Sequence, residues 1–301
     1  MIGMDRRAVE QTATPMDASI VIPTRDRPLE LMRCLRALGE QQTNRRFEVI
    51  VVDDGSMPPI LASDLEPLLN PRLIHSGGVG PAAARNRGVR AALAPFILFT
   101  DDDTAPSGHW VEAACAFLTT HPDHVGVEGR TESPKFDALY ERSVENRDPG
   151  AYWTCNVAYT RDALLQLDGF SEAFPAAHGE DLDLAFRALR LGPIGFRDDM
   201  VVTHYPVSVS IRDVIRRTRV GSSDIVLRRR HPDRFPSRLP VRLELPVAML
   251  RYLKKMLRRH RREMVGTPSR IARFAVIALG QFAVVVAIAL KPPDLGDENG
   301  R

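Results

Sequence analysis

Three short polar segments carry most of the side chains in this chain that could do chemistry. Each directly follows an apolar run: Pro23-Thr24-Arg25-Asp26, Asp53-Asp54-Gly55-Ser56 and Asp101-Asp102-Asp103-Thr104. Ligands of open α/β sheets bind outside the carboxyl ends of the strands, so we expect the three segments to meet in one crevice. So many carboxylates repel one another unless a cation lies among them.

The spacing of Asp101 and Asp103 indicates where that cation would bind, because an alternating pair can approach one divalent ion. Mg²⁺ or Mn²⁺ takes one or two carboxylates and fills its other positions with phosphate and water oxygens, which a nucleotide diphosphate supplies. A single aspartate after a strand is usually a turn or a helix cap. A triple aspartate, with a second acidic strand end in the same sheet, favours a metal–nucleotide site.

Two other enzyme classes place acids at strand ends. A dinucleotide-binding dehydrogenase could use Asp53 on a ribose, but the first strand is not followed by GxGxxG, and Gly77-Gly-Val-Gly80 has the wrong place and spacing. An aspartyl phosphatase also carries Asp-x-Asp after a strand, and Asp198-Asp199 would supply its later acids. Its motif usually opens the domain, whereas two strands with functional ends precede it here. The phosphatase therefore stays as a third-ranked alternative.

The elements that must position these residues follow the pattern of an α/β sheet. Apolar runs predict strands, and amphipathic or Ala-rich segments predict helices between them. The predicted strands cover 19–23, 47–53, 72–75, 96–100 and 151–159, and the predicted helices cover 28–41, 81–93, 108–120, 161–167 and 180–191. Continuous apolar strands separated by helices predict a parallel sheet covered on both faces.

Composition places the chain among soluble globular proteins. It has 301 residues, 44% hydrophobic and 26% charged, which excludes a wholly disordered or fibrous chain. The net charge of +3 does not indicate nucleic-acid binding, and no nucleic-acid partner is expected. Cys34, Cys115 and Cys155 form no CxxC pair, so they are expected to be buried free thiols in a reducing cytosol. Residues 1–17 lack a signal peptide and are expected to form a flexible tail.

The last third of the chain is basic and then apolar. Residues 211–273 are expected to form a basic helical extension, 274–290 an uncharged helix and 291–301 a polar tail. The uncharged helix would be about 25 Å long, slightly short of the roughly 30 Å hydrocarbon core of a bilayer. It could span if Arg273 and Lys291 reach the interfaces. The alternative is a helix packed on the catalytic domain or on a second subunit.

The basic flank favours membrane association. We expect a protein at the cytoplasmic face of the cell membrane, because the excess of Lys and Arg precedes the apolar run. It would bind an anionic membrane surface, either peripherally or through a single span. Such a tail suits a substrate that is itself a membrane lipid.

The motifs resemble, in order, those of family-2 glycosyltransferases of the GT-A fold. The matching segments are Ser19–Arg27, Val49–Ser56, Pro81–Gly88, Phe99–Thr104, Leu167–Phe170 and Gly179–Leu184. The resemblance spans about residues 18–206. It implies an α/β, GT-A-type nucleotide-diphospho-sugar transferase fold, with a mixed, mostly parallel sheet flanked by helices. The catalytic domain would cover 18–210.

The same resemblance implies roles for matching residues. The donor nucleotide would be bound by residues at the strand ends and one arginine: Pro23, Thr24, Arg25, Asp53, Asp54, Arg85, Asp101 and Asp102. Mg²⁺ or Mn²⁺ would bind Asp103 and Asp101, with His204 near the metal or the diphosphate. Asp181 resembles the catalytic base, and Glu180 lies beside it. A helix start also favours acids for its dipole, so both roles can hold together.

The implied reaction is an inverting transfer of one sugar from a UDP-, GDP- or dTDP-linked donor. The acceptor would be a hydroxyl of a lipid-linked or cell-envelope glycan. Arg216–Arg219 does not match the Gln-x-x-Arg-Trp signature of processive synthases, which favours the addition of a single sugar. A non-catalytic nucleotide-sugar-binding membrane scaffold is the alternative. The presence of Asp101, Asp103 and Asp181 argues against it.

Overall fold

The computed structural model describes residues 15–236 apart from 66, 68, 138, 175–176 and 218–219, short stretches between 246 and 258, and residues 267–290. The predicted tails at 1–17 and 291–301 lie outside the described residues, except for 15–17. So does most of the predicted basic extension beyond 236.

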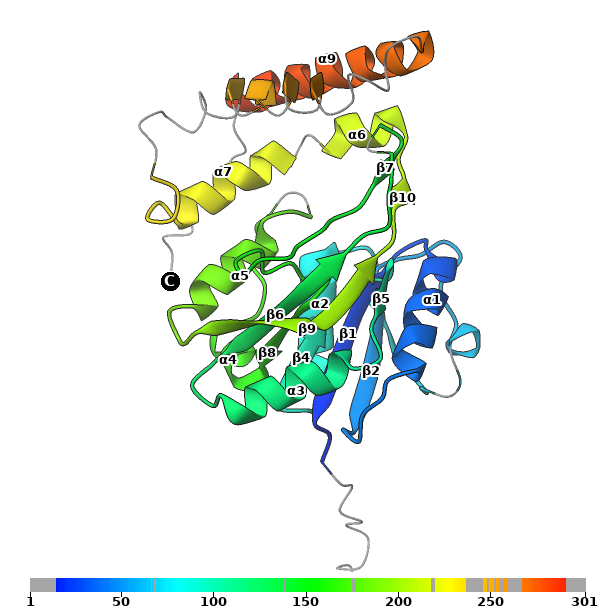
Figure 1. Ribbon diagram of the computed structural model, residues 1–301, viewed down its shortest axis with the longest axis vertical. Coiled ribbons are helices and arrows are strands. Elements are labelled where there is room, and N and C mark those ends of the chain that lie inside the picture. Colours follow the sequence, from blue (N-terminus) through cyan, green and yellow to red (C-terminus); the bar gives the residue numbers. More distant parts are fainter. Residues whose placement is uncertain are drawn as a thin grey trace, which may run out of the picture.

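An eight-stranded mixed sheet forms the centre of the molecule, in the order β3-β2-β1-β4-β8-β6-β9-β5 (Figure 1). The strands are β1 Ala18–Thr24, β2 Phe47–Asp53, β3 Arg72–His75, β4 Phe96–Phe99, β5 Thr104–Pro106, β6 Gly126–Glu132, β8 Val157–Thr160 and β9 Ile194–His204. Strands β3, β2, β1 and β4 run parallel, as do β6 and β9. Strand β8 is antiparallel to β4 and β6, and β5 is antiparallel to β9. The predicted mixed, mostly parallel sheet is confirmed.

Helices cover both faces of the sheet. The helices are α1 Pro28–Gly39, α2 Pro81–Ala91, α3 Trp110–Thr120, α4 Arg161–Gln166, α5 Glu180–Ala188, α6 Ile211–Arg217, α7 Val220–Arg230 and α9 Pro268–Leu290, with a short 3₁₀ turn at Ala62–Asp64. In β1, Ile20 and Ile22 are buried in the cluster that contains α1 and α3, and Val21 is buried with α2 on the other face. Continuous apolar strands therefore form the parallel half, as expected for a sheet covered on both sides.

Helix α2 packs closely on β1 because Gly88 lacks a side chain. A Cβ at this position would lie 2.3 Å from Cγ1 of Val21. Such a contact would push the helix away from the sheet. The close packing fixes the position of Arg85, which lies one turn earlier in α2.

The second half of the sheet differs from the prediction. Strand β8 begins only at Val157, whereas 151–159 was the expected strand. The segment before it turns because the backbone N–H groups of Gly150 and Tyr152 donate to the carboxylate of Glu128. Strands β6 and β9 have no continuous apolar run, and β9 contains Arg197, Asp198 and Asp199. Their sequences therefore did not indicate strands.

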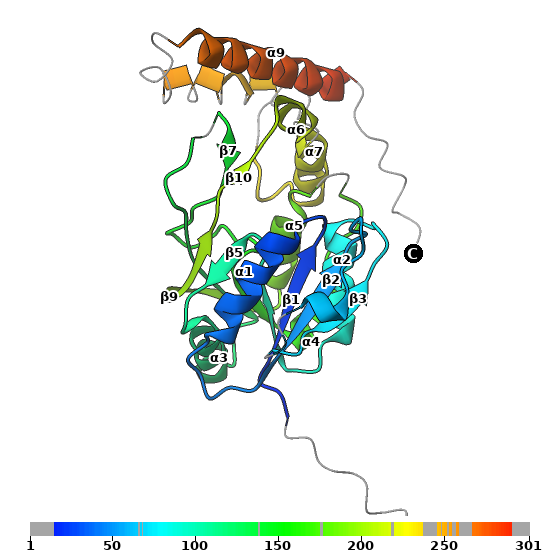
Figure 2. The ribbon, with the colours of Figure 1, turned by 90° about the vertical axis from the view of Figure 1, so that its right-hand side faces the viewer.

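Helices α6, α7 and α9 lie beyond the carboxyl end of β1. Figures 1 and 2 show α9 across this end of the molecule, with α6 and α7 between it and the sheet. Ile225 of α7 and Val285 of α9 are buried together. Beside these helices, β7 (Glu141–Arg142) pairs antiparallel with β10 (Val207–Ser208).

Helix α9 begins earlier than the predicted apolar segment. It starts at Pro268 rather than at 274, so its 23 residues extend about 35 Å. Its stretch Pro268–Ile288 is long and apolar enough to cross a bilayer, and only 17% of the most apolar part is buried. Its first turns contact the segment between β6 and β7: Arg270 pairs with Asp137 at 2.7 Å, and Arg273 donates to the carbonyl of Leu139 at 2.6 Å.

Candidate active site

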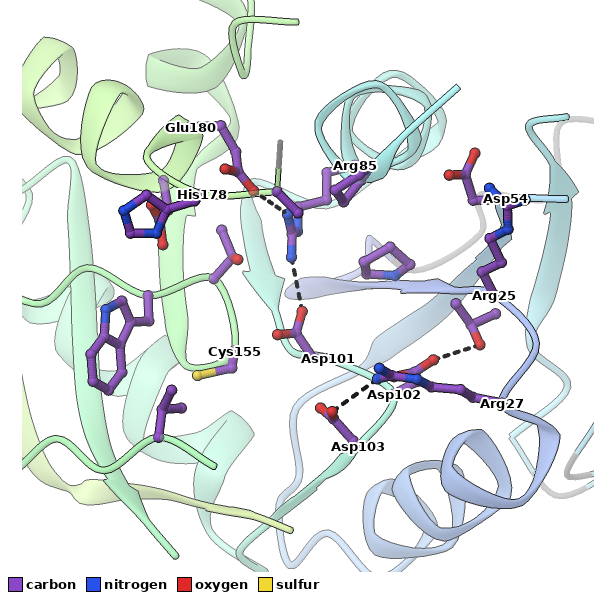
Figure 3. A pocket seen from close by; sticks show the side chains of 18 of the residues that line it. Arg25, Arg27, Asp54, Arg85, Asp101, Asp102, Asp103, Cys155, His178 and Glu180 are labelled. Carbon is purple, nitrogen blue, oxygen red and sulfur yellow. Dashed lines mark hydrogen bonds and ion pairs between the residues drawn. The ribbon is translucent and has the colours of Figure 1, made fainter. Parts of the chain in front are cut away.

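The three polar strand ends meet in one cavity of about 640 Å³ (Figure 3). It lies at the carboxyl ends of β1, β2 and β4, which the crossover rule for α/β sheets predicts. Eleven of the twelve predicted site residues line it: Pro23, Thr24, Arg25, Asp54, Arg85, Asp101, Asp102, Asp103, Glu180, Asp181 and His204. The structure therefore brings these eleven residues together in one place.

Asp53 is the predicted residue that does not line the cavity. Its carboxylate accepts hydrogen bonds from the backbone N–H groups of Ser56 (2.9 Å) and Ile60 (3.2 Å), and it lies 3.2 Å from Nδ1 of His75. Burial acts to raise the pKa of Asp53, but the hydrogen bonds outweigh it and the pKa is lowered. Asp53 thus orders the turn after β2.

Asp54 fixes a glycine-rich loop that forms one wall of the cavity. Its two carboxylate oxygens accept from the backbone N–H groups of Val79 (2.8 Å) and Gly80 (2.9 Å) and from the hydroxyl of Ser76 (2.6 Å). Gly80 has a positive φ of 94°. This backbone conformation is open to glycine at little cost, which lets the loop pass close to the carboxylate.

Asp101, Asp103 and His204 form a cluster that fits a divalent cation, called here the metal-type cluster. One ligand atom from each lies within 4.8 Å of the others. The pairing of β5 with β9 creates the cluster, because Thr104 lies opposite His204 in the register. His204 Nε2 then lies 3.4 Å from Asp103 Oδ1. Two hard carboxylate oxygens and one imidazole nitrogen suit Mn²⁺, and the two carboxylates suit Mg²⁺.

Arg27, for which sequence reasoning gave no role, balances part of this negative charge. Its Nη1 lies 3.1 Å from Asp102 Oδ1 and 2.9 Å from Asp103 Oδ2. Asp102 also accepts from the hydroxyl of Thr24 at 2.8 Å, and burial raises the pKa of Asp102 to about 7. The signal in the sequence was the position of Arg27 immediately after the first polar segment.

Arg142 of β7 is a second cation that the sequence did not indicate. It lines the cavity, and its Nε is buried with no hydrogen-bond partner among the described residues. Burial lowers its pKa. The residue lies in the two-residue strand β7, outside every motif, so no local pattern pointed to it.

The two acids at the start of α5 face the same cavity. Gly179 precedes them with a φ of 87°, which turns the chain into the helix. Arg85 joins these acids to the metal-type cluster: Nη2 donates to Asp101 at 2.9 Å and Nη1 donates to Glu180 at 3.2 Å (Figure 3). Burial raises the pKa of both Glu180 and Asp181. A carboxylate of raised pKa is better matched to accept a proton near neutral pH.

Helix α7 holds α5 in place through a buried carboxylate. Asp183 is fully buried, and it lies 2.8 Å from Arg187, 2.9 Å from Arg230 and 2.9 Å from His231. A second contact joins His178 to Asp224 at 3.1 Å. The hydrogen bond to Asp224 raises the pKa of His178, which also lines the cavity.

Comparison with known proteins gives one matching family and several relatives. The family model described as glycosyl transferase family 2 matches residues 19–168. The pre-mycofactocin glycosyltransferase of Mycobacterium tuberculosis is 30% identical over 246 residues, which cover 72% of this chain and 49% of the relative. The chondroitin synthase of Escherichia coli is 34% identical over 222 residues, covering 58% and 32%. The chain thus spans about half the length of the first relative.

Two solved structures share the fold. The mannosyltransferase PcManGT from Pyrobaculum calidifontis, in complex with GDP-Man and Mn²⁺, is 18% identical with a TM-score of 0.57, covering 91% of this chain and 88% of that one. S. aureus TarS 1–349, in complex with UDP-GlcNAc, is 18% identical with a TM-score of 0.54, covering 92% of each chain. The fold of the chain is therefore the GT-A type that its motifs implied.

Proposed function

The chain belongs to glycosyl transferase family 2, and on that premise we propose that it moves one sugar from a nucleotide-diphosphate donor to an acceptor hydroxyl, with inversion. The observation that carries the proposal is the arrangement of this cavity. Its wall holds both the cluster suited to a divalent ion and the two acids Glu180 and Asp181, and Arg85 bridges the two groups through Asp101 and Glu180.

The donor nucleotide would lie over the carboxyl ends of β1 and β2. Pro23, Thr24, Arg25 and the loop that Asp54 holds line this part of the cavity. Arg25 is half exposed and so is available to a ligand. The fold neighbours are complexes with UDP-GlcNAc and with GDP-Man, which supports a UDP-, GDP- or dTDP-sugar as the donor class.

Asp101, Asp103 and His204 would hold Mg²⁺ or Mn²⁺. When bound, the ion supplies positive charge that neutralises the diphosphate leaving group. Arg27 pairs with Asp102 and Asp103, and Arg85 pairs with Asp101, so these two arginines compensate part of the negative charge of the three aspartates. Arg142 adds a further positive charge to the wall.

Asp181 would accept the proton of the acceptor hydroxyl. The freed oxygen then attacks the anomeric carbon from the face opposite the diphosphate, the new C–O bond forms, and the bond to the diphosphate oxygen breaks. The electron pair leaves with the nucleoside diphosphate, and the proton stays on Asp181. One displacement inverts the anomeric centre, and no carboxylate nucleophile is needed.

Donor turnover tests this function against its alternatives. UDP-, GDP- and dTDP-sugars would be incubated with the full chain and Mn²⁺, and release of nucleoside diphosphate would be measured. We expect release from at least one donor. Binding of a donor without release would favour a non-catalytic scaffold. A phosphoenzyme trapped by acid quenching would favour the phosphatase.

We further propose that α9 lies along an anionic membrane at the cytoplasmic face, where a lipid-linked or cell-envelope acceptor would be presented. Ile271, Val276 and Leu279 of this helix are about half exposed or more. The segment 251–267 that leads into it is rich in Lys and Arg. Arg273 holds the first turns of the helix on the catalytic domain, and Val285 holds a later turn on α7. Contacts near both ends favour a helix in the plane of the interface rather than across the bilayer.

Co-sedimentation with vesicles that contain anionic lipid tests this placement. Leu279 is 73% exposed, so Leu279→Glu should reduce binding without unfolding the chain. The matched control is Leu165→Glu, since Leu165 is also exposed but lies on α4 at the opposite end of the molecule (Figure 1). Salt should weaken binding of the unchanged chain, because the basic flank acts through screened charges. Equal binding by the two variants would contradict the placement.

A further inference from the structure

A second cavity of about 620 Å³ adjoins the candidate active site. The two cavities share Arg27 and Arg142. The remaining wall comes from α1, β10 and α6: Glu30, Arg33, Pro206, Val207, Ser208, Val209 and Asp213. We propose that this second cavity binds the phosphate group of a lipid-linked acceptor. The proposal rests on the proposed function and specifies the acceptor.

Arginines with free hydrogen-bond donors make the cavity suited to a phosphate. Nε of Arg142 and Nε of Arg33 are both buried and have no hydrogen-bond partner among the described residues. A buried donor without a partner is costly, and guanidinium groups match phosphate oxygens in geometry and charge. The guanidinium of Arg33 lies 3.9 Å from the ring centroid of Tyr205. Stacking of this kind holds the plane of the guanidinium fixed.

The wall holds three arginines and two acids, and among the described residues neither Arg33 nor Arg142 forms an ion pair. Asp213 accepts a hydrogen bond from the hydroxyl of Ser210 at 2.6 Å, so this carboxylate is engaged by its own helix start. Glu30 is the other acid of the wall. Arg27 is engaged by Asp102 and Asp103. Arg33 and Arg142 therefore remain to face an anion.

The position of the cavity favours a lipid as the source of the phosphate. Its wall at Val209 is attached to α9, because Arg273 donates to the carbonyl of Val209 at 2.7 Å. The N–H of Val209 donates to the carbonyl of Tyr140. The ring centroid of Tyr140 lies 4.4 Å from Cζ of Arg273. The cavity wall is thus fastened to the helix proposed to lie on the membrane. A phosphate at the bilayer surface would enter beside α9, next to the metal-type cluster.

Binding of a short-chain lipid phosphate to the full chain tests the proposal. The probe is dihexanoyl phosphatidic acid, titrated with Mn²⁺ and a saturating nucleoside diphosphate present so that the first cavity is filled. Inorganic phosphate and dihexanoyl glycerol are titrated alongside. We expect the phosphatidic acid to bind more tightly than either. Equal affinity for inorganic phosphate would indicate a small-anion site and overturn the lipid assignment.

Three variants localise the binding. Arg33 lines only the second cavity, so Arg33→Gln should weaken probe binding by roughly tenfold or more, the usual effect of losing a charge-assisted hydrogen bond, and leave nucleotide affinity unchanged. Arg142→Gln should weaken probe binding as well. Arg36→Gln on the exposed side of α1 is the matched control and should change nothing. Melting temperatures confirm that each variant is folded.

Two results would overturn the proposal. One is unchanged probe binding in both Arg33→Gln and Arg142→Gln. The other is displacement of the probe by nucleoside diphosphate, which would assign Arg142 to the donor site. Failure of the proposed function can be distinguished from failure of this proposal. If the proposed function is wrong, the unchanged chain shows no donor turnover, but probe binding and its loss in Arg33→Gln can still be measured.

Discussion

Arg85 on α2 donates from Nη1 to Oε1 of Glu180 on α5, across 3.2 Å. Its other terminal nitrogen donates to Asp101 at 2.9 Å. Arg85 is only 5% exposed. One buried guanidinium therefore sets the distance between the metal-type cluster and the acids at the start of α5.

Replacing Arg85 by lysine should separate its two roles. Arg85→Lys keeps the positive charge but cannot donate to Asp101 and Glu180 at once, because an ammonium on a flexible stem lacks the planar fork. We expect donor turnover to fall by about tenfold or more while the chain stays folded. Steady-state kinetics and a melting curve check this. Arg90→Lys, on the exposed end of the same helix, is the control. Unchanged turnover in Arg85→Lys would show that the double contact of Arg85 with Asp101 and Glu180 is not needed for activity.

Removing one carboxylate of the cluster should abolish the effect of Mn²⁺ on nucleoside-diphosphate binding. Asp103→Asn keeps the size of the side chain but loses a charged ligand. We expect Mn²⁺ to strengthen nucleoside-diphosphate binding in the unchanged chain and to have little effect in the variant. Titration calorimetry with Mn²⁺ and with a chelator measures both. Asp148→Asn at an exposed position should behave as the unchanged chain. A metal effect that persists in Asp103→Asn would contradict the assignment.

The rate should rise with pH along an acidic limb. Burial raises the pKa of Asp181 above the ordinary aspartate value of about 3.9, and the base works only when deprotonated. Turnover with saturating donor and metal should therefore increase through a pKa above this value and then level off. Glu180→Gln should move the limb to lower pH, because it removes a neighbouring negative charge. A rate that is flat to below pH 4 would exclude Asp181 as the titrating base.

The contact of α5 with α7 should contribute strongly to stability. Asp183→Asn leaves Arg187, Arg230 and His231 around a neutral group, and losing one partner of a buried ion pair costs about 3–5 kcal/mol. The pKa of Asp183 is lowered by Arg187 and its other partners, although burial alone would raise it. Its stabilising contribution is thus full above about pH 4 and is lost as the pH falls through the lowered pKa.

Denaturant unfolding at several pH values measures this contribution. The unchanged chain should exceed Asp183→Asn in free energy of unfolding at neutral pH, and the difference should shrink on acidification. Asp162→Asn, at an exposed position of α4, should change stability by no more than about 0.5 kcal/mol. If the unchanged chain and Asp183→Asn differed little in free energy of unfolding at pH 7, other contacts would hold α7.

The parallel half of the sheet and the acids at its strand ends were predictable from the sequence because each signal is local. The run Phe47–Asp53 is both a buried strand and the support of the residues that follow it. Asp101 and Asp103 are only two residues apart in the sequence, so their pairing is a local signal. Their cluster with His204 depends on the β5–β9 register, which the sequence did not indicate; only the resemblance to the family implied a place for His204 near the metal.

Long-range geometry explains what the sequence did not indicate. Arg142 enters the cavity only because β7 pairs with β10, two strands that are each two residues long. Asp53 and Asp54 are neighbours with the same side chain, yet one orders the turn after β2 and the other holds the glycine loop. The sequence did not indicate that α9 starts at Pro268, because Arg270 and Arg273 were assigned to the basic segment. In the structure they contact Asp137 and Leu139, which precede β7.

The most direct test of the account compares donor affinity and turnover in Asp181→Asn with those of the unchanged chain. Asp181 lines the cavity at the start of α5, and it is not one of the three residues of the metal-type cluster. The variant should bind donor and Mn²⁺ with nearly unchanged affinity, while kcat falls by roughly 10²–10⁴, the usual share of general-base catalysis. Unchanged kcat, or a collapse of donor affinity in place of kcat, would contradict the role of Asp181 as the base.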